Sequence, residues 1–232
     1  MRKSPWAYSL RALLLVLATV LTIGIVWVVN AIWFKPFSIN TFFNRAMIEV
    51  ALDSPEMLSS LRILESVGLN FHNDDLNDAS PESTMELLEK VSDYKATLAS
   101  YDDASLTKSE QLSKKIAMYM LDTVVEGKDF AFHNYPVNQL FGVQNGFPTF
   151  MDSTHQVNDL QGAEDYITRL EKSAVKFDQV LAGLRYREEK GILPPAFVVD
   201  RVVKEMSEFV AQPTQDNILY ASFTKKVAKA ER

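Results

Sequence analysis

Histidine and acidic side chains are the candidates for chemistry in this sequence, because the absence of cysteine excludes thiolate nucleophiles, thiolate zinc ligands and disulfides. The three histidines are His72, His133 and His155. None lies four residues from another, and the H-E-x-x-H pattern, which presents two imidazoles to zinc from one helix, does not occur. We therefore interpret each histidine as a capping or hydrogen-bonded loop residue, with His155 the best functional candidate.

An acidic turn at residues 73–78 (NDDLND) has the carboxylate density of a calcium loop. An EF-hand requires glycine at its sixth position and glutamate at its twelfth, where this chain has Asp78 and Thr84. We interpret the segment as a solvated turn before a helix. The glycine spacing also matches no serine-hydrolase elbow, phosphate loop or dinucleotide fingerprint. The sequence therefore predicts no catalytic residue, no metal site and no cofactor in this chain.

The central segment 135–158 departs from the helical pattern on either side of it. It combines two prolines, two glycines and three phenylalanines with several amides, so neither a helical nor a strand period fits. It is also too apolar for a solvated linker. We predict one long ordered loop packed between helices.

Ordered loops of this length commonly bind ligands or cover a site. Phenylalanine rings and amide side chains in such a loop would line a groove that holds an extended peptide. The alternative is that the rings fill the core while the amides bind loop backbone. The candidate substrate-binding residues are Asn138, Gln139, Phe141, Phe147, Phe150 and His155.

The N-terminal region contains 23 consecutive uncharged residues, Ala12–Phe34. As a helix this run spans ~34 Å, enough for a bilayer core of ~30 Å. Aromatic residues favour the membrane interfaces, and here they are Trp6, Tyr8, Trp27 and Trp33. Arg2, Lys3 and Arg11 precede the run, while Lys35 and Arg45 follow it, which favours a cytoplasmic N-terminus.

A cleaved signal peptide is the competing interpretation of this region, since both share a basic start and an apolar middle. The run is longer than a signal-peptide core of about 7–15 residues, and no Ala-x-Ala site follows it before Lys35. We therefore predict an uncleaved anchor. Residues 1–36 would form a cytoplasmic tip and a single transmembrane helix in a bacterial inner membrane, and residues 37–232 a periplasmic domain.

The body of the protein is acidic, although the whole chain has a net charge of only −6. Setting aside the four cations of residues 1–35 leaves 20 basic and 30 acidic residues, a net charge of −10. Such a body has no electrostatic footprint for nucleic acid. With 47% hydrophobic residues, it can bury one substantial core. The expected partners are the lipid bilayer and a peptide.

Three sequences predict helix starts in the body. Ser54-Pro55-Glu56 and Ser80-Pro81-Glu82 each place a capping residue before a proline and an acid. Residues 107–110 (TKSE) fit a capping box. Further helical periods run from about residue 163 to Gly191, from the proline pair 194–195 to Pro213, and over 218–230.

The apolar residues at helical spacing predict which helix faces are buried. In the helix after the capping box they are Leu112, Ile116, Tyr119, Met120 and Val124. In the longest helix they are Ala163, Tyr166, Ile167, Leu170, Ala174, Phe177, Leu181 and Leu184, and in the next Val199, Val202, Val203, Met206, Phe209 and Val210. We predict an all-α fold, with a short hairpin in the central loop as the one alternative.

Several stretches, in order, resemble the bacterial family catalogued as domain of unknown function 885. They are residues 136–142 (PVNQLFG), 147–150 (FPTF), 163–170 (AEDYITRL) and 190–196 (KGILPPA), and residues 54–56 and 75–80 are similar to its upstream segment. The resemblance covers roughly residues 37–232. It implies a mostly helical domain whose relatives are regarded as zinc metallopeptidases.

In that family the zinc-binding H-E-x-x-H helix lies in the C-terminal half, which this chain does not reach, so no zinc ligand or general base is carried over. The resemblance implies a membrane-anchored N-terminal portion that contributes the anchor and a wall of the substrate cleft. Zinc is expected only where the C-terminal half is present, and that half is a further expected partner. The alternative is a non-enzymatic periplasmic module that binds a protein or peptide through loop 135–158.

Overall fold

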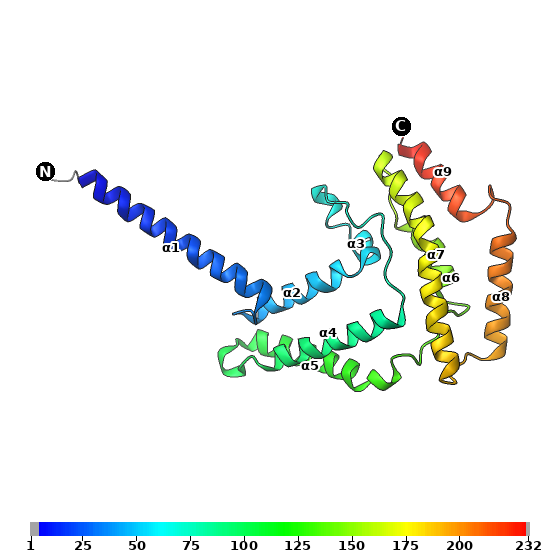
Figure 1. Cartoon of the computed structure of the whole chain (residues 1–232), viewed down its shortest axis with the longest axis horizontal. Helices are drawn as coiled ribbons and strands as arrows, with labels where there is room; N and C mark the ends of the chain where they lie inside the picture. The colour runs from blue at the N-terminus through cyan, green and yellow to red at the C-terminus, as the bar shows by residue number, and fades with distance from the viewer. Residues whose placement is uncertain (1–4, 231–232) are drawn as a thin grey trace. The chain divides into compact units, whose positions relative to one another are not determined.

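The computed structural model describes residues 5–230, and the side chains of residues 13–230. Every regular element in that range is a helix, which confirms the all-α fold, and no hairpin forms within 135–158 (Figure 1). The predictions of interfacial aromatic residues and flanking charges before the apolar run concern residues or side chains that the structure does not describe. These are Arg2, Lys3, Trp6, Tyr8 and Arg11. The α-helices are α1 (Pro5–Trp33), α2 (Ile39–Leu52), α3 (Pro55–Leu61), α4 (Pro81–Ala99), α5 (Lys108–Glu126), α6 (Val143–Ser153), α7 (Leu160–Glu189), α8 (Ala196–Ala211) and α9 (Ile218–Ala230).

Helix α1 contains a segment, Leu13–Trp33, that is long and apolar enough to cross a membrane. Its mean hydropathy is 2.5, and none of it is buried against the rest of the protein. The hydroxyls of Thr19 and Thr22 donate to the carbonyl oxygens of Leu15 and Ala18, each at 2.9 Å. These polar groups are therefore satisfied within the helix, as a lipid environment requires. A signal sequence would meet the same criteria of length and composition.

The chain forms two compact units, and the first combines the described part of Met1–Glu49 with Ser92–Asp122. Its core consists of Ile39, Phe42, Leu98 and Tyr101. The Tyr101 hydroxyl donates to the carbonyl oxygen of Pro36 at 2.7 Å. Arg45 in α2 donates to the carbonyl oxygen of Phe34 at 2.7 Å, so the end of α1 is fixed to the helix that follows.

The predicted buried face of α5 is wrong. Leu112, Ile116, Tyr119, Met120 and Val124 are between 42% and 75% exposed. Ala117, Met118 and Leu121 pack on the core of this unit instead. The helix carries apolar residues on two sides, and the sequence period does not reveal which side is covered.

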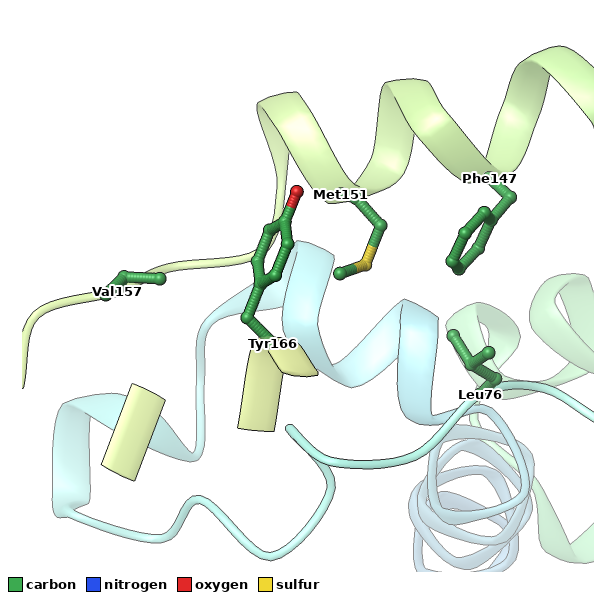
Figure 2. Close-up of a cluster of buried hydrophobic side chains, with 5 residues drawn as sticks. All are labelled: Leu76, Phe147, Met151, Val157 and Tyr166. Atoms are coloured by element: carbon green, nitrogen blue, oxygen red, sulfur yellow. The ribbon is translucent and has the colours of Figure 1, made fainter. Parts of the chain in front are cut away.

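The second unit combines Val50–Val91 with Thr123–Arg232. Its core, drawn in Figure 2, consists of Leu76, Phe147, Met151, Val157 and Tyr166. Phe147 and Met151 project from α6 on the same side of the helix, where Leu76 and Tyr166 lie (Figure 2). Helix α9 packs against α6 and α7. Helices α7 and α8 lie side by side and run in opposite directions (Figure 1).

Helix α6 lies within the segment predicted to be a long loop. Pro148 and Gly146 disfavour a helix there, because proline removes a backbone donor and glycine costs entropy. Burial of Phe147, Pro148 and Met151 offsets that cost. The rest of 135–158 is irregular, so the ordered loop is divided by one short helix.

The covered face of α7 agrees with the predicted one in part. Tyr166 is buried and Ala163, Leu170 and Phe177 pack on the core as expected, but Ile167 and Leu181 are 46% and 44% exposed. Several charged residues take their place, and the buried positions of α7 are Asp165, Tyr166, Arg169, Lys176, Val180, Gly183 and Arg187. One stripe of α7 thus binds the core through polar contacts, while its apolar stripe is partly open to solvent.

Candidate functional site

Arg169 is a fully buried cation whose guanidinium contacts neutral acceptors. Its Nε donates to the carbonyl oxygen of Asp75 at 2.8 Å, and one Nη donates to Nδ1 of His155 at 2.8 Å. The other Nη donates to the Ser59 hydroxyl at 2.8 Å and to the carbonyl oxygen of His72 at 2.9 Å. Burial lowers the pKa of Arg169 to about 10, so it stays charged at neutral pH. This one side chain joins α7 to three other segments of the second unit, namely α3, the turn that contains His72 and Asp75, and the chain after α6.

His155 is held as a neutral imidazole by two fixed contacts. Arginine cannot accept a hydrogen bond, so Nδ1 of His155 is the acceptor in its contact with Arg169. Nε2 therefore carries the proton and donates to the carbonyl oxygen of Gly162 at 3.0 Å. Burial, aided by the charges of Arg169 and Lys226, lowers the pKa of His155 to about 4. Both ring nitrogens are occupied, so His155 is not free to bind a ligand.

Lys226 of α9 caps the C-terminal end of α6. Its ammonium donates to the carbonyl oxygens of Met151 at 2.5 Å and His155 at 2.7 Å. These carbonyls lie where a helix lacks internal donors. The hydroxyl of Tyr166 on α7 donates to the carbonyl oxygen of Leu219 at 2.9 Å. Both ends of α9 are therefore bound to neighbouring helices.

The acidic turn 73–78 is bound to α7 by two lysines. Lys172 lies 3.3 Å from a carboxylate oxygen of Asp74 and 3.4 Å from one of Asp75. Lys176 pairs with Glu56, whose carboxylate also accepts from the backbone N–H of Asn77 at 3.0 Å. The turn is thus part of the scaffold rather than a purely solvated connection.

A groove runs along α8, where it faces α7. We call its two hollows the amide cavity, of about 450 Å³, and the aliphatic cavity, of about 390 Å³. Met206 lines both, so the two hollows lie next to each other. The amide cavity is lined by Gln144, Asn145, Phe147, Pro148, Ser173, Phe177, Glu205, Met206, Glu208, Phe209, Val210, Gln212 and Leu219.

The aliphatic cavity lies toward the start of α8. Its walls come from α7, from α8 and from the segment that begins at Tyr135. The apolar residues that line it include Leu181, Leu184, Val199, Val202 and Val203. Beside it, the buried guanidinium of Arg187 donates to the carbonyl oxygen of Phe132 at 3.0 Å and to Asn134 Oδ1 at 2.5 Å, which fixes the segment before Tyr135.

The rest of the protein covers only part of the apolar face of α8. Val198 and Val202 are buried, whereas Val199, Val203, Met206 and Val210 are 43%, 57%, 41% and 82% exposed. The expectation of an inward position is therefore confirmed for Val202 and wrong for the last four of these residues. Their spacing places them on one stripe of the helix, next to the buried residues. That stripe lines the groove, since all four belong to its walls.

The predicted site residues separate into different surroundings. Phe147 lines the amide cavity, where it meets Phe177 edge-on at 6.1 Å between ring centroids. Phe150 lies beneath the guanidinium of Arg169, with 4.9 Å from Cζ to the ring centroid. Phe141 is 90% exposed. His155 is bound in the Arg169 network.

The two predicted amides lie on the loop before α6. Asn138 accepts from the backbone N–H groups of Leu140 at 2.9 Å and Phe141 at 2.8 Å, so its oxygen is engaged within the loop. Gln139 is half-buried and lines neither cavity. The structure thus brings one of the six predicted residues, Phe147, into the groove.

Sequence reasoning missed the residues of α8 and the two amides at the start of α6, Gln144 and Asn145, as groove residues. It also missed Arg169 as the centre of the scaffold. The sequence does contain a pattern that places these residues on one side of α7, because the basic residues at 169, 176 and 187 recur at spacings close to whole helical turns. Such a basic stripe is usually a solvated face, so the pattern alone does not show burial.

The histidines do not fit a zinc site. His72 Nε2 contacts Glu65 Oε1 at 3.2 Å, His133 is an exposed residue edge-on to Phe130, and His155 uses both nitrogens. Among residues 13–230, no three His, Asp or Glu side chains gather where they could hold a metal ion. No hydrolytic step is assigned to the described residues.

Comparison with known proteins gives one family. The family model described as bacterial protein of unknown function (DUF885) matches residues 62–232. The match begins later than residue 37, where the resemblance was expected to start, and includes α4 to α9 and the whole groove. No curated protein and no solved structure matches the chain.

Proposed function

Because this chain belongs to the family described as bacterial protein of unknown function (DUF885), we propose a function from its own geometry: it is a membrane-anchored module that binds a peptide in the groove between α7 and α8. One observation carries the proposal. The facing sides of α7 and α8 are apolar and only partly covered, with Leu181, Val203 and Met206 between 41% and 57% exposed.

The composition of the groove suits an extended peptide. Aliphatic and aromatic residues supply room for apolar side chains, while Gln144, Asn145 and Gln212 supply amide groups that pair with backbone N–H and C=O. A nucleic acid would need strongly basic walls. The amide cavity has no basic residue, and the aliphatic cavity has Arg185 and Arg187 beside Glu188 among mostly apolar residues. The groove therefore resembles a binding site for a polypeptide segment.

The scaffold beneath the groove is suited to hold its shape before a ligand arrives. Arg169 fixes the chain after α6 through His155, and Lys226 binds the end of α6 to α9. Arg187 fixes the segment that enters the aliphatic cavity. A wall that is already ordered costs less entropy on binding than one that must fold.

The anchor would keep this module at a membrane. In our proposal α1 spans a bacterial inner membrane with its N-terminus in the cytoplasm, and the remainder lies in the periplasm. The hydrogen bond from Arg45 to Phe34 supports a direct connection between the span and the first unit. Tethering raises the local concentration of the groove near membrane-associated peptides.

We further propose that the groove forms one wall of the substrate cleft of a zinc metallopeptidase-like protein. This chain would then contribute the anchor and peptide contacts but no catalytic residue. We expect the pure 232-residue chain to show no peptidase activity of its own. Zinc-dependent, chelator-sensitive hydrolysis by such a preparation would contradict this form of the proposal and leave peptide binding untouched.

The test of the proposed function uses the full chain in nanodiscs of zwitterionic lipid. The probes are short fluorescent peptides, blocked at both ends, that contain leucine and phenylalanine. The variant replaces Val203 and Met206 by glutamine, and both side chains are exposed enough that folding should persist. Losing two apolar contacts should weaken binding about tenfold or more, measured by fluorescence anisotropy.

The matched control is Val175→Gln on α7. Val175 is 60% exposed and lines neither cavity, so it tests the loss of exposed apolar surface without touching the groove. Its peptide affinity should equal that of the unmodified chain. Equal affinity of the groove variant and the control, or no binding of any apolar peptide, would overturn the proposal.

A further inference from the structure

The amide cavity has an unusual charge distribution for a peptide site. Its walls carry two carboxylates, from Glu205 and Glu208, three side-chain amides and an apolar floor of phenylalanines, and no lysine, arginine or histidine lines it. The carboxylates and the floor lie together in one hollow. A ligand that fits must therefore combine apolar surface with hydrogen-bond donors or positive charge.

Two residues that line this cavity each have a side-chain acceptor atom without a partner in the described part of the chain. The two atoms are Gln144 Oε1 and Glu205 Oε2, and both are buried. The orientation of Gln144 is fixed, because its Nε2 donates to the carbonyl oxygen of Asn138 at 2.6 Å. A buried acceptor without a donor costs free energy, and such groups mark places where a donor is expected.

The acidic residues of the cavity are only weakly paired within the protein. Glu205 Oε1 lies 3.3 Å from Nε of Arg201, and Glu208 lies 3.8 Å from Lys204. These pairs join residues four apart along α8 whose basic partners are largely exposed, and pairs of that kind contribute about 0.3–0.5 kcal/mol. A cation from a ligand can therefore replace the internal partner at little cost.

We propose that the amide cavity selects peptides in which lysine or arginine adjoins a large apolar residue. The apolar side chain contacts Phe147, Phe177 and Phe209, and the cation contacts Glu205 and Glu208. Backbone or side-chain N–H groups of the peptide reach Gln144 Oε1. This inference rests on the proposed peptide-binding function and adds a preference for positive charge.

The experiment compares three blocked peptides that differ at two positions flanking a central phenylalanine, which hold lysine, serine or glutamate. Affinities are measured with the full chain in zwitterionic nanodiscs, so that lipid charge does not attract the cationic probe. We expect the lysine peptide to bind about fivefold more tightly than the serine peptide at about 50 mM salt, and the preference to shrink at about 500 mM. The glutamate peptide should bind most weakly.

The deciding variant is Glu205→Gln with Glu208→Gln, which removes both charges and keeps the side-chain shapes. It should bind the lysine and serine peptides with equal affinity. The control is Glu164→Gln with Glu171→Gln, which removes the same charge from exposed positions of α7 outside the cavity. The control should keep the full preference.

The outcomes separate the two proposals. Equal binding of lysine and serine peptides to the unmodified chain would overturn the charge preference and leave peptide binding intact. Loss of the preference in the control as well as in the groove variant would assign it to the overall acidity of the body, which also overturns the inference. No binding of any of the three peptides would overturn both proposals.

Discussion

Arg169 Nη1 and His155 Nδ1 lie 2.8 Å apart, both fully buried, and this contact joins α7 to the chain just after α6. The same guanidinium donates to Ser59 and to two backbone carbonyls. Four acceptors from three segments thus depend on one cation. Since α6 and α7 form walls of the amide cavity, the contact is also part of the support of the groove.

We predict that Arg169→Lys destabilises the second unit by about 3–5 kcal/mol, because an ammonium cannot reach all the acceptors that the planar guanidinium bridges. The measurement is chemical denaturation of the full chain in detergent, followed by circular dichroism. Arg201→Lys is the control, since that side chain is 70% exposed and pairs with Glu205. A loss below about 1 kcal/mol would show that Arg169 is not a structural centre.

The stability of the second unit should depend on pH through His155. Its pKa in the folded protein is lowered from its ordinary 6.5 to about 4, so the unfolded chain binds the extra proton first as the pH falls. The contribution of the neutral ring to the free energy of unfolding is complete above about pH 6.5. It is lost as the pH falls toward 4, by roughly 1.4 kcal/mol per pH unit.

The variant His155→Asn isolates this effect. An asparagine oxygen accepts from Arg169 as Nδ1 does, but it does not titrate. The pH slope of unfolding free energy between about 6 and 4.5 should therefore be smaller in the variant than in the unmodified chain. His133→Asn, at an exposed position, should leave the slope unchanged. An identical slope in all three proteins would exclude His155 as the source.

Helix starts were predictable because they depend on local chemistry. In the capping box, the Thr107 N–H donates to Glu110 Oε2 at 2.9 Å, and the Glu110 N–H donates to Thr107 Oγ at 3.3 Å. Ser80 likewise accepts from the N–H of Ser83 at 3.1 Å. At Ser54 the helix begins as predicted, at Pro55, but without a side-chain capping bond. Contacts within a few residues of each other leave a readable pattern.

The groove was not predictable from the same patterns, because it depends on which side of a helix is covered. Both Val202 and Val203 lie on the apolar face of α8, yet one is 4% and the other 57% exposed. Arg169 and Arg187 lie in the core because distant carbonyl oxygens surround them, and no local spacing encodes those partners. Helix α6 was missed because burial outweighs the local cost of Gly146 and Pro148.

Replacing Gly142, which precedes α6, and Gly146, which lies within it, by alanine should change the stability in opposite directions. At Gly142 an added Cβ would lie 2.5 Å from the backbone N and 2.6 Å from the backbone O of Asn138. Gly142→Ala should therefore lower stability by about 1–3 kcal/mol. At Gly146, no heavy atom lies within 4 Å of the added Cβ, so Gly146→Ala should stabilise the helix by about 0.5–1 kcal/mol. Melting temperatures that shift in the same direction would contradict this.

Removing the ammonium of Lys226 should loosen α9 from α6. Lys226→Met keeps the aliphatic stem but leaves the carbonyl oxygens of Met151 and His155 without this donor, at a cost of about 1–3 kcal/mol. Amide hydrogen exchange should increase in residues 218–230 more than elsewhere. Lys225→Met, at an exposed neighbouring position, is the control. Unchanged exchange in α9 would indicate that Tyr166 and apolar packing alone hold this helix.

The apolar helix α1 gives a prediction that separates a membrane span from a removed signal sequence. Leu17→Lys with Val20→Lys places two charges inside the segment Leu13–Trp33, and each costs about 2.5–3.5 kcal/mol in a bilayer centre. If α1 spans the membrane, the unmodified chain should resist carbonate extraction and retain residues 1–34 by mass spectrometry, whereas the variant should be extracted. A mature protein that lacks these residues would show cleavage. The groove would then act free of the bilayer, without the gain in local concentration that tethering provides.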